Sequence, residues 1–136
     1  MLQQSIIDPC IDKVITSVRV DEHEVRIHFA DGVTLYLTDD ASHCCERRYM
    51  STDDDLAPFV GSKFMGVEVR EGYDRAFPYV FTEERGYVST SHGYEDQHDV
   101  DFMLVTTSLG VFTCAAHNEH NGYYGGMDIT ASTVEK

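Results

Sequence analysis

The chain has 136 residues, a length that favours one domain spanning 1–136 and that can bury a hydrophobic core without disulfides or a metal. Hydrophobic residues make up 42% of it and charged residues 25%, as in an ordinary globular protein, and no apolar run reaches the roughly 18 residues that span a membrane. The 24 acidic and 10 basic side chains give a formal charge of −14, which argues against general nucleic-acid binding because such binding needs a basic face.

The N-terminal sequence and the cysteines indicate a compartment. The first residues have neither the basic nor the apolar region of a signal peptide, so we expect a cytoplasmic protein. The four cysteines are Cys10, Cys44, Cys45 and Cys114. Their spacing is not that of a disulfide framework, and we expect them to be reduced.

The first forty residues carry the clearest strand pattern. Residues 1–10 are predicted to form an arm or a first short strand, because Pro9 blocks a helix there. Alternating apolar and polar side chains then predict three strands, over 14–20, 25–29 and 33–38. Asp31-Gly32 separates the last two and predicts a tight hairpin turn in which both residues have positive φ.

The alternation stops over residues 39–50, and a short helix is predicted near 52–60. Ser51 or Thr52 can cap this helix, and the acidic residues 53–55 suit the positive end of its dipole.

The second half of the chain returns to strands. Residues 73–98 hold little periodicity and are predicted to form a long hairpin or an insertion. Alternation predicts further strands over 65–70, 100–104, 111–116 and 127–131. Seven or so strands and one short helix predict a mainly β domain, either a β-sandwich or a strongly bent antiparallel sheet with the helix packed on it.

Two polar segments interrupt this pattern, and we predict both as loops. The first polar segment, residues 43–49, reads HCCERRY, and the second, residues 117–126, reads HNEHNGYYGG. Connecting segments that are this rich in polar side chains carry ligand-binding or catalytic sites more often than core strands do. If the two segments meet in space, they form one candidate site.

Ligand binding without turnover is the function that we expect of these segments. Arginine can hold a phosphate or carboxylate through paired hydrogen bonds, and a mixture of Tyr, Asn and Gly is typical of recognition loops. The alternative is structural, because Asn-Gly and Gly-Gly are turn dipeptides and the arginines can pair with nearby carboxylates. The candidate ligand-binding residues are Arg47, Arg48, Tyr49, Asn118, Glu119, Asn121, Tyr123 and Tyr124.

A zinc site is the alternative that we keep open, while no cofactor is expected otherwise. Thiolate and imidazole are zinc ligands, so Cys44 or Cys45 could bind a metal together with His117 and His120. The spacing departs from zinc signatures, because adjacent cysteines cannot both easily bind one ion.

A cysteine nucleophile is a second chemical alternative. The neighbouring arginines would lower the pKa of a thiol at Cys44 or Cys45, and His117 or His120 could serve as its base. The structural alternative is that one cysteine is a small buried hydrophobe. We favour that alternative, and the chain is therefore not expected to be an enzyme.

Four stretches of the chain resemble a family of small proteins encoded mainly by bacteriophages and prophages. They are CCERRYM at 44–50, DDDL at 53–56, FVG at 59–61 and HNEHNGYYGG at 117–126. The resemblance covers most of residues 12–131. It implies a genomic setting and no mechanism, since the family has no established activity.

These observations lead to three functional hypotheses. The first is a phage accessory protein, of the host-takeover or anti-defence type, that binds a host protein or a small ligand such as a nucleotide immune signal. The second is a zinc-binding or metal-dependent hydrolytic protein. The third is an acidic inhibitor that mimics nucleic acid. Exposed strand edges would also allow a homo-oligomer.

Overall fold

The computed structural model describes residues 2–41, 47–73, 79–82, 86–89, 97–120 and 127–135. Ten strands lie in these ranges: β1 (Ile15–Val20), β2 (Glu24–Phe29), β3 (Val33–Asp39), β4 (Arg47–Ser51), β5 (Phe64–Tyr73), β6 (Tyr79–Thr82), β7 (Gly86–Ser89), β8 (Gln97–Thr107), β9 (Gly110–His120) and β10 (Ile129–Glu135).

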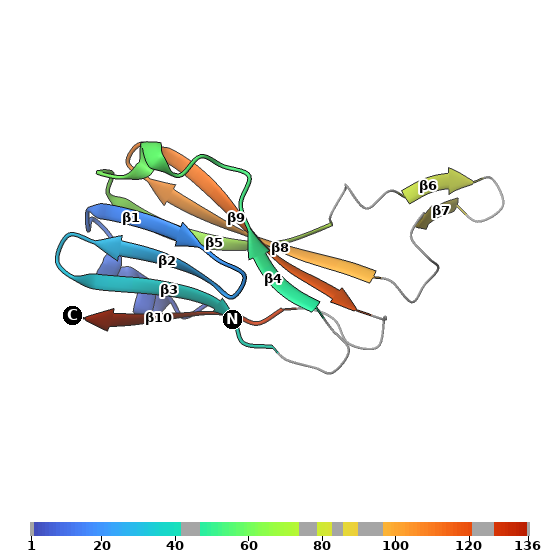
Figure 1. Ribbon diagram of the computed structural model, residues 1–136, viewed down its shortest axis with the longest axis horizontal. Helices are drawn as coiled ribbons and strands as arrows, with labels where there is room; N and C mark the ends of the chain where they lie inside the picture. The colour runs from blue at the N-terminus through green and yellow to red at the C-terminus, as the bar shows by residue number, and fades with distance from the viewer. Residues whose placement is uncertain are drawn as a thin grey trace.

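Eight of the described strands form two antiparallel sheets of four strands each (Figure 1). The first sheet has the order β1-β2-β3-β10, and the second has the order β4-β9-β8-β5. Between β5 and β8, which pair with each other, the chain forms a small antiparallel pair from β6 and β7. The expected mainly β, antiparallel fold is confirmed.

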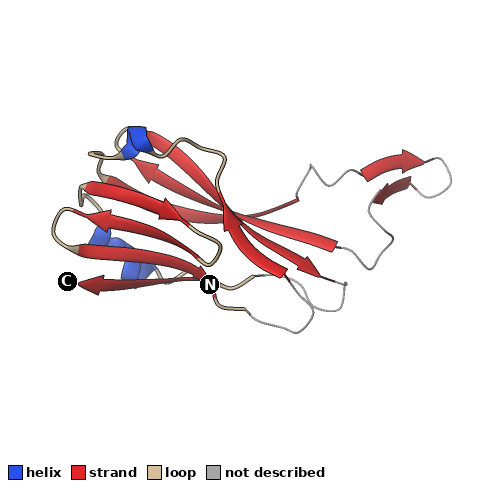
Figure 2. Ribbon diagram, viewed as in Figure 1, coloured by secondary structure: helices blue, strands red, loops and turns tan. Residues whose placement is uncertain are grey.

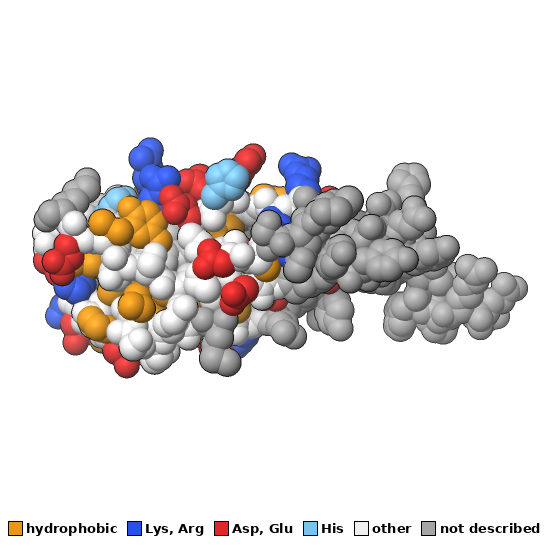
Figure 3. Space-filling view, turned by 90° about the horizontal axis from the view of Figure 1, so that it is seen from below, with side chains coloured by type: hydrophobic (Ala, Val, Ile, Leu, Met, Phe, Trp, Pro, Cys, Tyr) orange, Lys and Arg blue, Asp and Glu red, His pale blue; other side chains and the backbone are white. Residues whose placement is uncertain are grey.

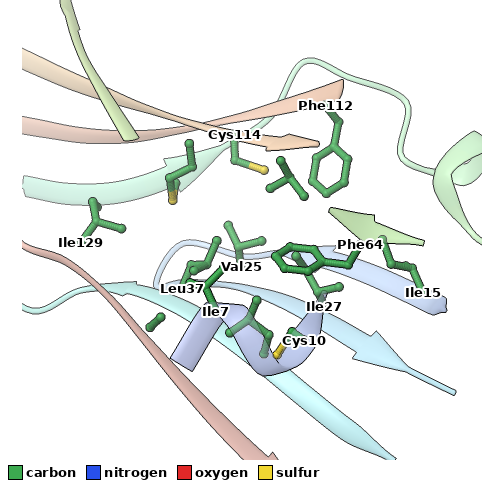
Figure 4. Packing of buried hydrophobic residues seen from close by; sticks show 14 of the residues in the cluster. Ile7, Cys10, Ile15, Val25, Ile27, Leu37, Phe64, Phe112, Cys114 and Ile129 are labelled. Atoms are coloured by element: carbon green, nitrogen blue, oxygen red, sulfur yellow. The ribbon is translucent and has the colours of Figure 1, made fainter. Parts of the chain in front are cut away.

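The core lies between the two sheets (Figure 4). On β2 the side chains of Val25, Ile27 and Phe29 alternate inward, and Leu35 and Leu37 continue this face on β3. The second sheet contributes Phe64, Met103, Val105, Phe112 and Cys114, all buried. This alternation of buried and exposed positions is the two-residue period seen in the sequence.

Backbone hydrogen bonds join the two sheets where β1 and β5 begin. The amide of Ile15 donates to the carbonyl of Ser62 at 2.8 Å, and the amide of Phe64 donates to the carbonyl of Lys13 at 2.9 Å. The ring of Phe64 then meets the ring of Phe29 edge-on, with centroids 5.7 Å apart.

The N-terminal residues form helical turns rather than the expected arm or strand (Figure 2). They are the α-helix α1 (Gln4–Ile7) and the 3₁₀ helix η1 (Asp8–Cys10). Pro9 does not block η1, because it occupies the first turn, where a missing N–H costs nothing. Ile7 and Cys10 are buried, so these turns close one side of the core.

The expected short helix near 52–60 is present as a single 3₁₀ turn, η2 (Ala57–Phe59). It is short because the preceding polar side chains bond to other parts of the backbone. The Asp54 carboxylate accepts the amide of Thr113 at 2.7 Å, and the Thr52 hydroxyl donates to the Thr113 carbonyl at 2.8 Å. These bonds tie an extended loop to β9.

The hairpin of β2 and β3 is confirmed, but its turn differs from the expected two-residue turn. Three residues, 30–32, connect the strands, and of Asp31 and Gly32 only Gly32 has positive φ, at +90°. The Asp31 carboxylate accepts the amide of Val33 at 3.0 Å, so the aspartate supports the turn through its side chain.

Parts of both polar segments are strands rather than loops. Residues 47–49 belong to β4, and residues 117–120 extend β9 to His120. Local apolar alternation is weak there, and the strands form because their backbones pair with each other. Among the described residues, no helix is long and apolar enough to cross a membrane.

We predict that Phe64→Ala destabilises the protein strongly, because the side chain is fully buried between the sheets. Truncating such an aromatic residue costs about 3–5 kcal/mol of unfolding free energy, measurable by urea denaturation. Leu109→Ala is the control, since this side chain is 67% exposed in the turn between β8 and β9, and it should change stability by less than about 0.5 kcal/mol. Equal losses for the two variants would contradict the proposed core.

Candidate functional site

The described parts of the two polar segments lie side by side, because β4 pairs with β9 (Figure 1). Three pairs of opposite residues result: Arg47 with Glu119, Arg48 with Asn118, and Tyr49 with His117. Directly opposed residues of antiparallel strands project to the same face of a sheet. The pairing therefore divides six of the candidate residues between the two faces of the sheet. The inner set is Arg48 and Asn118, and the outer set is Arg47, Glu119, Tyr49 and His117.

The inner set faces the first sheet. Arg48 and Asn118 lie two positions from Met50 and Ala116, which are buried in the core. Asn118 is fully buried, and its opposite residue on β8 is Asp99. Both Arg48 and Asn118 were expected to contact a ligand directly, but they lie at the polar end of the sandwich interior.

Asp39 is the partner that explains the position of Arg48. It lies at the end of β3 on the same face as Leu35 and Leu37. Its Oδ2 accepts a hydrogen bond from Nη1 of Arg48 at 2.7 Å, and the two side chains are only 8% and 15% exposed. This ion pair links the first sheet to β4.

The same carboxylate also binds the backbone on both sides of the polar segments. Its Oδ1 accepts the amide of Ala41 at 3.2 Å and the amide of Asp128 at 3.0 Å. Ala41 precedes the first polar segment, Arg48 lies within its end, and Asp128 follows the second segment. One carboxylate thus fixes three of the points where these segments enter or leave the sandwich.

Three residues of the outer set, together with Ser51, form a row of contacting side chains, which we call the outer ladder: Arg47, Tyr49, His117 and Ser51. The rings of Tyr49 and His117 are stacked, with centroids 4.5 Å apart and planes 9° apart. The Arg47 guanidinium carbon lies 4.9 Å from the Tyr49 ring centroid, a cation–π geometry. On the other side, Nε2 of His117 is 2.8 Å from Oγ of Ser51.

Arg47 is the most accessible charge of the outer ladder. Its side chain is 73% exposed, and its Nη1 lies 3.8 Å from Oε2 of Glu119, beyond hydrogen-bond length. A guanidinium whose face rests on a ring presents its N–H donors at its edge. That edge can bind a phosphate or a carboxylate.

A shallow groove of about 180 Å³ continues the outer face beyond Ser51. Its lining residues are Ser51, Thr52, Asp53, Asp54, Phe102, Thr113 and Ala115. The carboxylates there make this end of the face acidic, so the groove does not favour the anion that Arg47 would bind.

Sequence reasoning missed Ser51 and Asp39 as members of this region. Ser51 was expected to cap a helix, and its role depends on His117, which is 66 residues away in the chain. Asp39 carried a usable signal, because inward alternation at Leu35 and Leu37 places position 39 on the core face.

Several expected site residues lie outside the described residues, so their roles stay predictions. They are His43, Cys44, Cys45, Asn121, Tyr123 and Tyr124. His120 is described only as the last residue of β9. Within the described part of the chain, no three metal-capable side chains come together, and the proposed zinc ligands Cys44 and Cys45 lie outside that part.

The two cysteines that the structure does describe are unsuited to nucleophilic chemistry. Cys10 and Cys114 are both buried. Burial raises the pKa of the Cys114 thiol to about 12 and also raises the pKa of Cys10. Both are therefore thiols at neutral pH and serve as core residues.

Comparison with known proteins places the chain in one family. A family model for a domain of unknown function matches residues 8–129. No curated protein and no solved structure matches the chain. The match confirms that the chain belongs to a family of unknown function, and the matched range includes both polar segments.

We predict strong energetic coupling between Asp39 and Arg48. Because the pair is largely buried, Asp39→Ala or Arg48→Ala should each cost about 3 kcal/mol of unfolding free energy. The double variant should cost less than the sum of the two by at least about 1 kcal/mol, as measured by a double-mutant cycle in urea.

The exposed pair of Glu68 and Arg70, whose side chains are 60% and 62% exposed, is the matched control. Its variants Glu68→Ala and Arg70→Ala should change stability by no more than about 1 kcal/mol. Additive costs at Asp39 and Arg48 would contradict the role of their ion pair.

Proposed function

The chain belongs to the DUF7448 family, and we propose that it is a binding protein that holds a small anionic ligand at the outer ladder, without turnover. The observation that carries the proposal is the exposed Arg47 guanidinium resting on the stacked rings of Tyr49 and His117. A nucleotide-type immune signal is the specific ligand that we propose.

The outer ladder supports this proposal because its cation is oriented in advance. The Tyr49 ring supports the face of the guanidinium, and His117 in turn supports that ring from the neighbouring strand. Holding a flexible arginine in place lowers the entropy lost on binding. Its edge can then form paired hydrogen bonds with a phosphate.

The remaining candidate residues divide between orientation and contact. We assign Arg48 and Asn118 an orienting role, since Arg48 is largely buried in its ion pair with Asp39 and Asn118 is fully buried opposite it on β9. We assign direct contact with the ligand to Arg47, whose guanidinium packs on the Tyr49 ring. Stacking of Tyr123 or Tyr124 on a base belongs to the proposal and rests on the sequence alone.

The formal charge of −14 opposes an anionic ligand at long range. Salt limits this opposition, since the Debye length is about 8 Å at physiological ionic strength. The nearest described carboxylate is Glu119, whose Oε2 is 3.8 Å from Nη1 of Arg47. Glu119 therefore competes with the ligand for Arg47. An anion binds only if its interaction with the Arg47 guanidinium is stronger than that of the Glu119 carboxylate.

The proposed setting is the cytoplasm of a bacterial host, where a phage or prophage protein would act on host machinery or immunity. Its support is the resemblance of the CCERRYM and HNEHNGYYGG motifs to phage-encoded proteins. A host protein is the other partner class that an exposed arginine and aromatic rings could bind.

Mimicry of nucleic acid is less well supported than ligand binding. A mimic would need its carboxylates gathered on one face. On the face shown in Figure 3, the Asp and Glu side chains are interspersed with Lys, Arg and hydrophobic side chains.

We predict that cyclic di-AMP, used as a probe of the nucleotide class, binds the purified protein in isothermal titration calorimetry. Arg47→Ala should weaken binding at least about tenfold, the equivalent of one charge-assisted hydrogen bond. Arg70→Ala is the matched control, because Arg70 is also an exposed arginine of the second sheet beside a carboxylate. It should leave the affinity unchanged.

Inorganic phosphate and AMP, titrated in parallel, report how much of the binding depends on the phosphate alone. Absence of heat from all three probes at about 1 mM, the weak end of measurable affinity, would contradict the proposal. Equal effects of Arg47→Ala and Arg70→Ala would contradict the assignment of the site.

We also predict that Glu119→Gln strengthens binding of the same probe several-fold at low salt, because it removes the carboxylate that competes for Arg47. The gain should shrink as the sodium chloride concentration rises. Glu68→Gln, next to Arg70, is the control and should not change affinity. Weaker binding by Glu119→Gln would instead make Glu119 a ligand contact.

A further inference from the structure

An exposed apolar surface lies at the end of the sandwich away from the outer ladder. Among the residues that the structure describes, six large hydrophobic side chains are exposed, and five of them lie at this end. They belong to the entry into β1, the end of η2, the start of β5, the turn between β8 and β9, and the start of β9 (Figure 1). We call these five residues the end patch: Val14, Val60, Met65, Leu109 and Val111.

Backbone bonds gather these segments around Lys63. Val14 and Lys63 form an antiparallel bridge. The amide of Lys63 donates to Oγ of Ser108 at 2.9 Å, and its carbonyl accepts the amide of Ser108, also at 2.9 Å. Beside this turn, Phe59 of η2 packs on Phe112 of β9, with ring centroids 5.1 Å apart. These contacts bring the five members of the end patch to one end of the molecule.

The exposure of the end patch indicates a surface that another molecule covers. Its most exposed members are Leu109 at 67% and Val111 at 50%. Hydrophobic side chains that are exposed singly are ordinary, whereas a cluster of them marks an interaction surface. Val134, the sixth exposed residue of this kind, lies on β10 and outside the cluster.

Two side chains of opposite charge accompany the end patch. Lys63 and Asp12 are both exposed, and neither side chain forms an ion pair or a hydrogen bond within the described part of the chain. The amide of Asp12 donates to the carbonyl of Phe64 at 2.8 Å, so Asp12 adjoins the same segment as Lys63. The neighbouring Lys13, in contrast, pairs with Asp31. The surface therefore offers one cation and one anion for pairing with another molecule.

We infer that the end patch binds a second copy of this chain about a two-fold axis, with Lys63 of each copy pairing with Asp12 of the other. In a two-fold interface, a contact between residue i of one copy and residue j of the other is repeated in reverse. A surface with one cation, one anion and an apolar centre meets this condition by itself. The formal charge of −14 repels two copies, and the end patch reduces that repulsion because each copy contributes Lys63.

This contact leaves the outer ladder accessible. Val111 lies at the start of β9, whereas Glu119, opposite Arg47, lies eight positions further along the same strand. Eight positions of a strand span about 26 Å. The inference therefore does not depend on ligand binding, and the dimer would hold two outer ladders that are both open to solvent.

Sedimentation equilibrium of the whole chain tests the inference. Five side chains make a small contact, so we expect a monomer–dimer equilibrium with a dissociation constant of about 10–100 μM, weaker than for standard interfaces. Denaturation at about 1 μM then reports the monomer, in which Leu109→Ala has little effect.

One pair of variants locates the interface. Leu109→Asp places a carboxylate in the apolar centre of the end patch and should raise the dimer dissociation constant at least about tenfold. Val134→Asp is the matched control, because Val134 is also exposed, at 52%, but lies outside the end patch. It should leave the dissociation constant within about twofold.

A second pair of variants tests the reciprocal charges. Lys63→Glu and Asp12→Lys should each weaken self-association, because each puts like charges in contact at both symmetric positions. An equimolar mixture of the two variants should form a heterodimer, since both contacts then join opposite charges. Circular dichroism verifies that Asp12→Lys folds, as Asp12 has a φ of +73°.

A protein that stays monomeric at about 1 mM, the weak end of measurable affinity, would overturn the inference. So would a dimer that Leu109→Asp leaves intact, or one that Val134→Asp disrupts equally. Failure of the two folded charge variants to associate on mixing would overturn the pairing of Lys63 with Asp12. If Asp12→Lys does not fold, Leu109→Asp, Val134→Asp and Lys63→Glu decide alone.

Discussion

The arrangement of the candidate site depends on one largely buried ion pair, between Asp39 of the first sheet and Arg48 of the second. Removing two charges from water is costly, and their attraction alone often fails to offset that cost. Here the Asp39 carboxylate also accepts two backbone amides, at Ala41 and Asp128. The contacts of this one side chain thus hold β3, β4 and the approach to β10 together.

The two faces of the paired strands β4 and β9 therefore differ: one carries the ion pair that anchors them, and the other carries the proposed binding residues. Asn118 is buried and Arg48 is largely buried in its ion pair with Asp39, while Arg47, Tyr49 and His117 project from the outer face of the same strands. Sites on strands are positioned more closely than sites on loops. The outer ladder therefore owes its order to the packing on the opposite face of β4 and β9.

Much of the fold could be predicted from sequence, because apolar alternation reports burial directly. It revealed β2, β3 and β9, whose inward residues are almost all apolar. It failed at β4, where the inward residues include Arg48 and the strand exists through pairing with β9. The stacking of Tyr49 on His117 could not be predicted from the sequence either, since it depends on the register between two strands that are distant in the chain.

The pairing of β4 with β9 also makes two neighbouring arginines chemically different. Arg47 and Arg48 are identical in composition and adjacent in sequence, yet the strand turns one to solvent and the other to the interior. Successive side chains of a strand point to opposite faces, so the position in the strand, rather than the residue type, decides which arginine faces solvent. A slip of one residue would exchange them, burying the cation that faces solvent and exposing the one that joins the sheets. The number of residues between Ala41 and Arg47 thus decides which of the two arginines faces solvent at the proposed site.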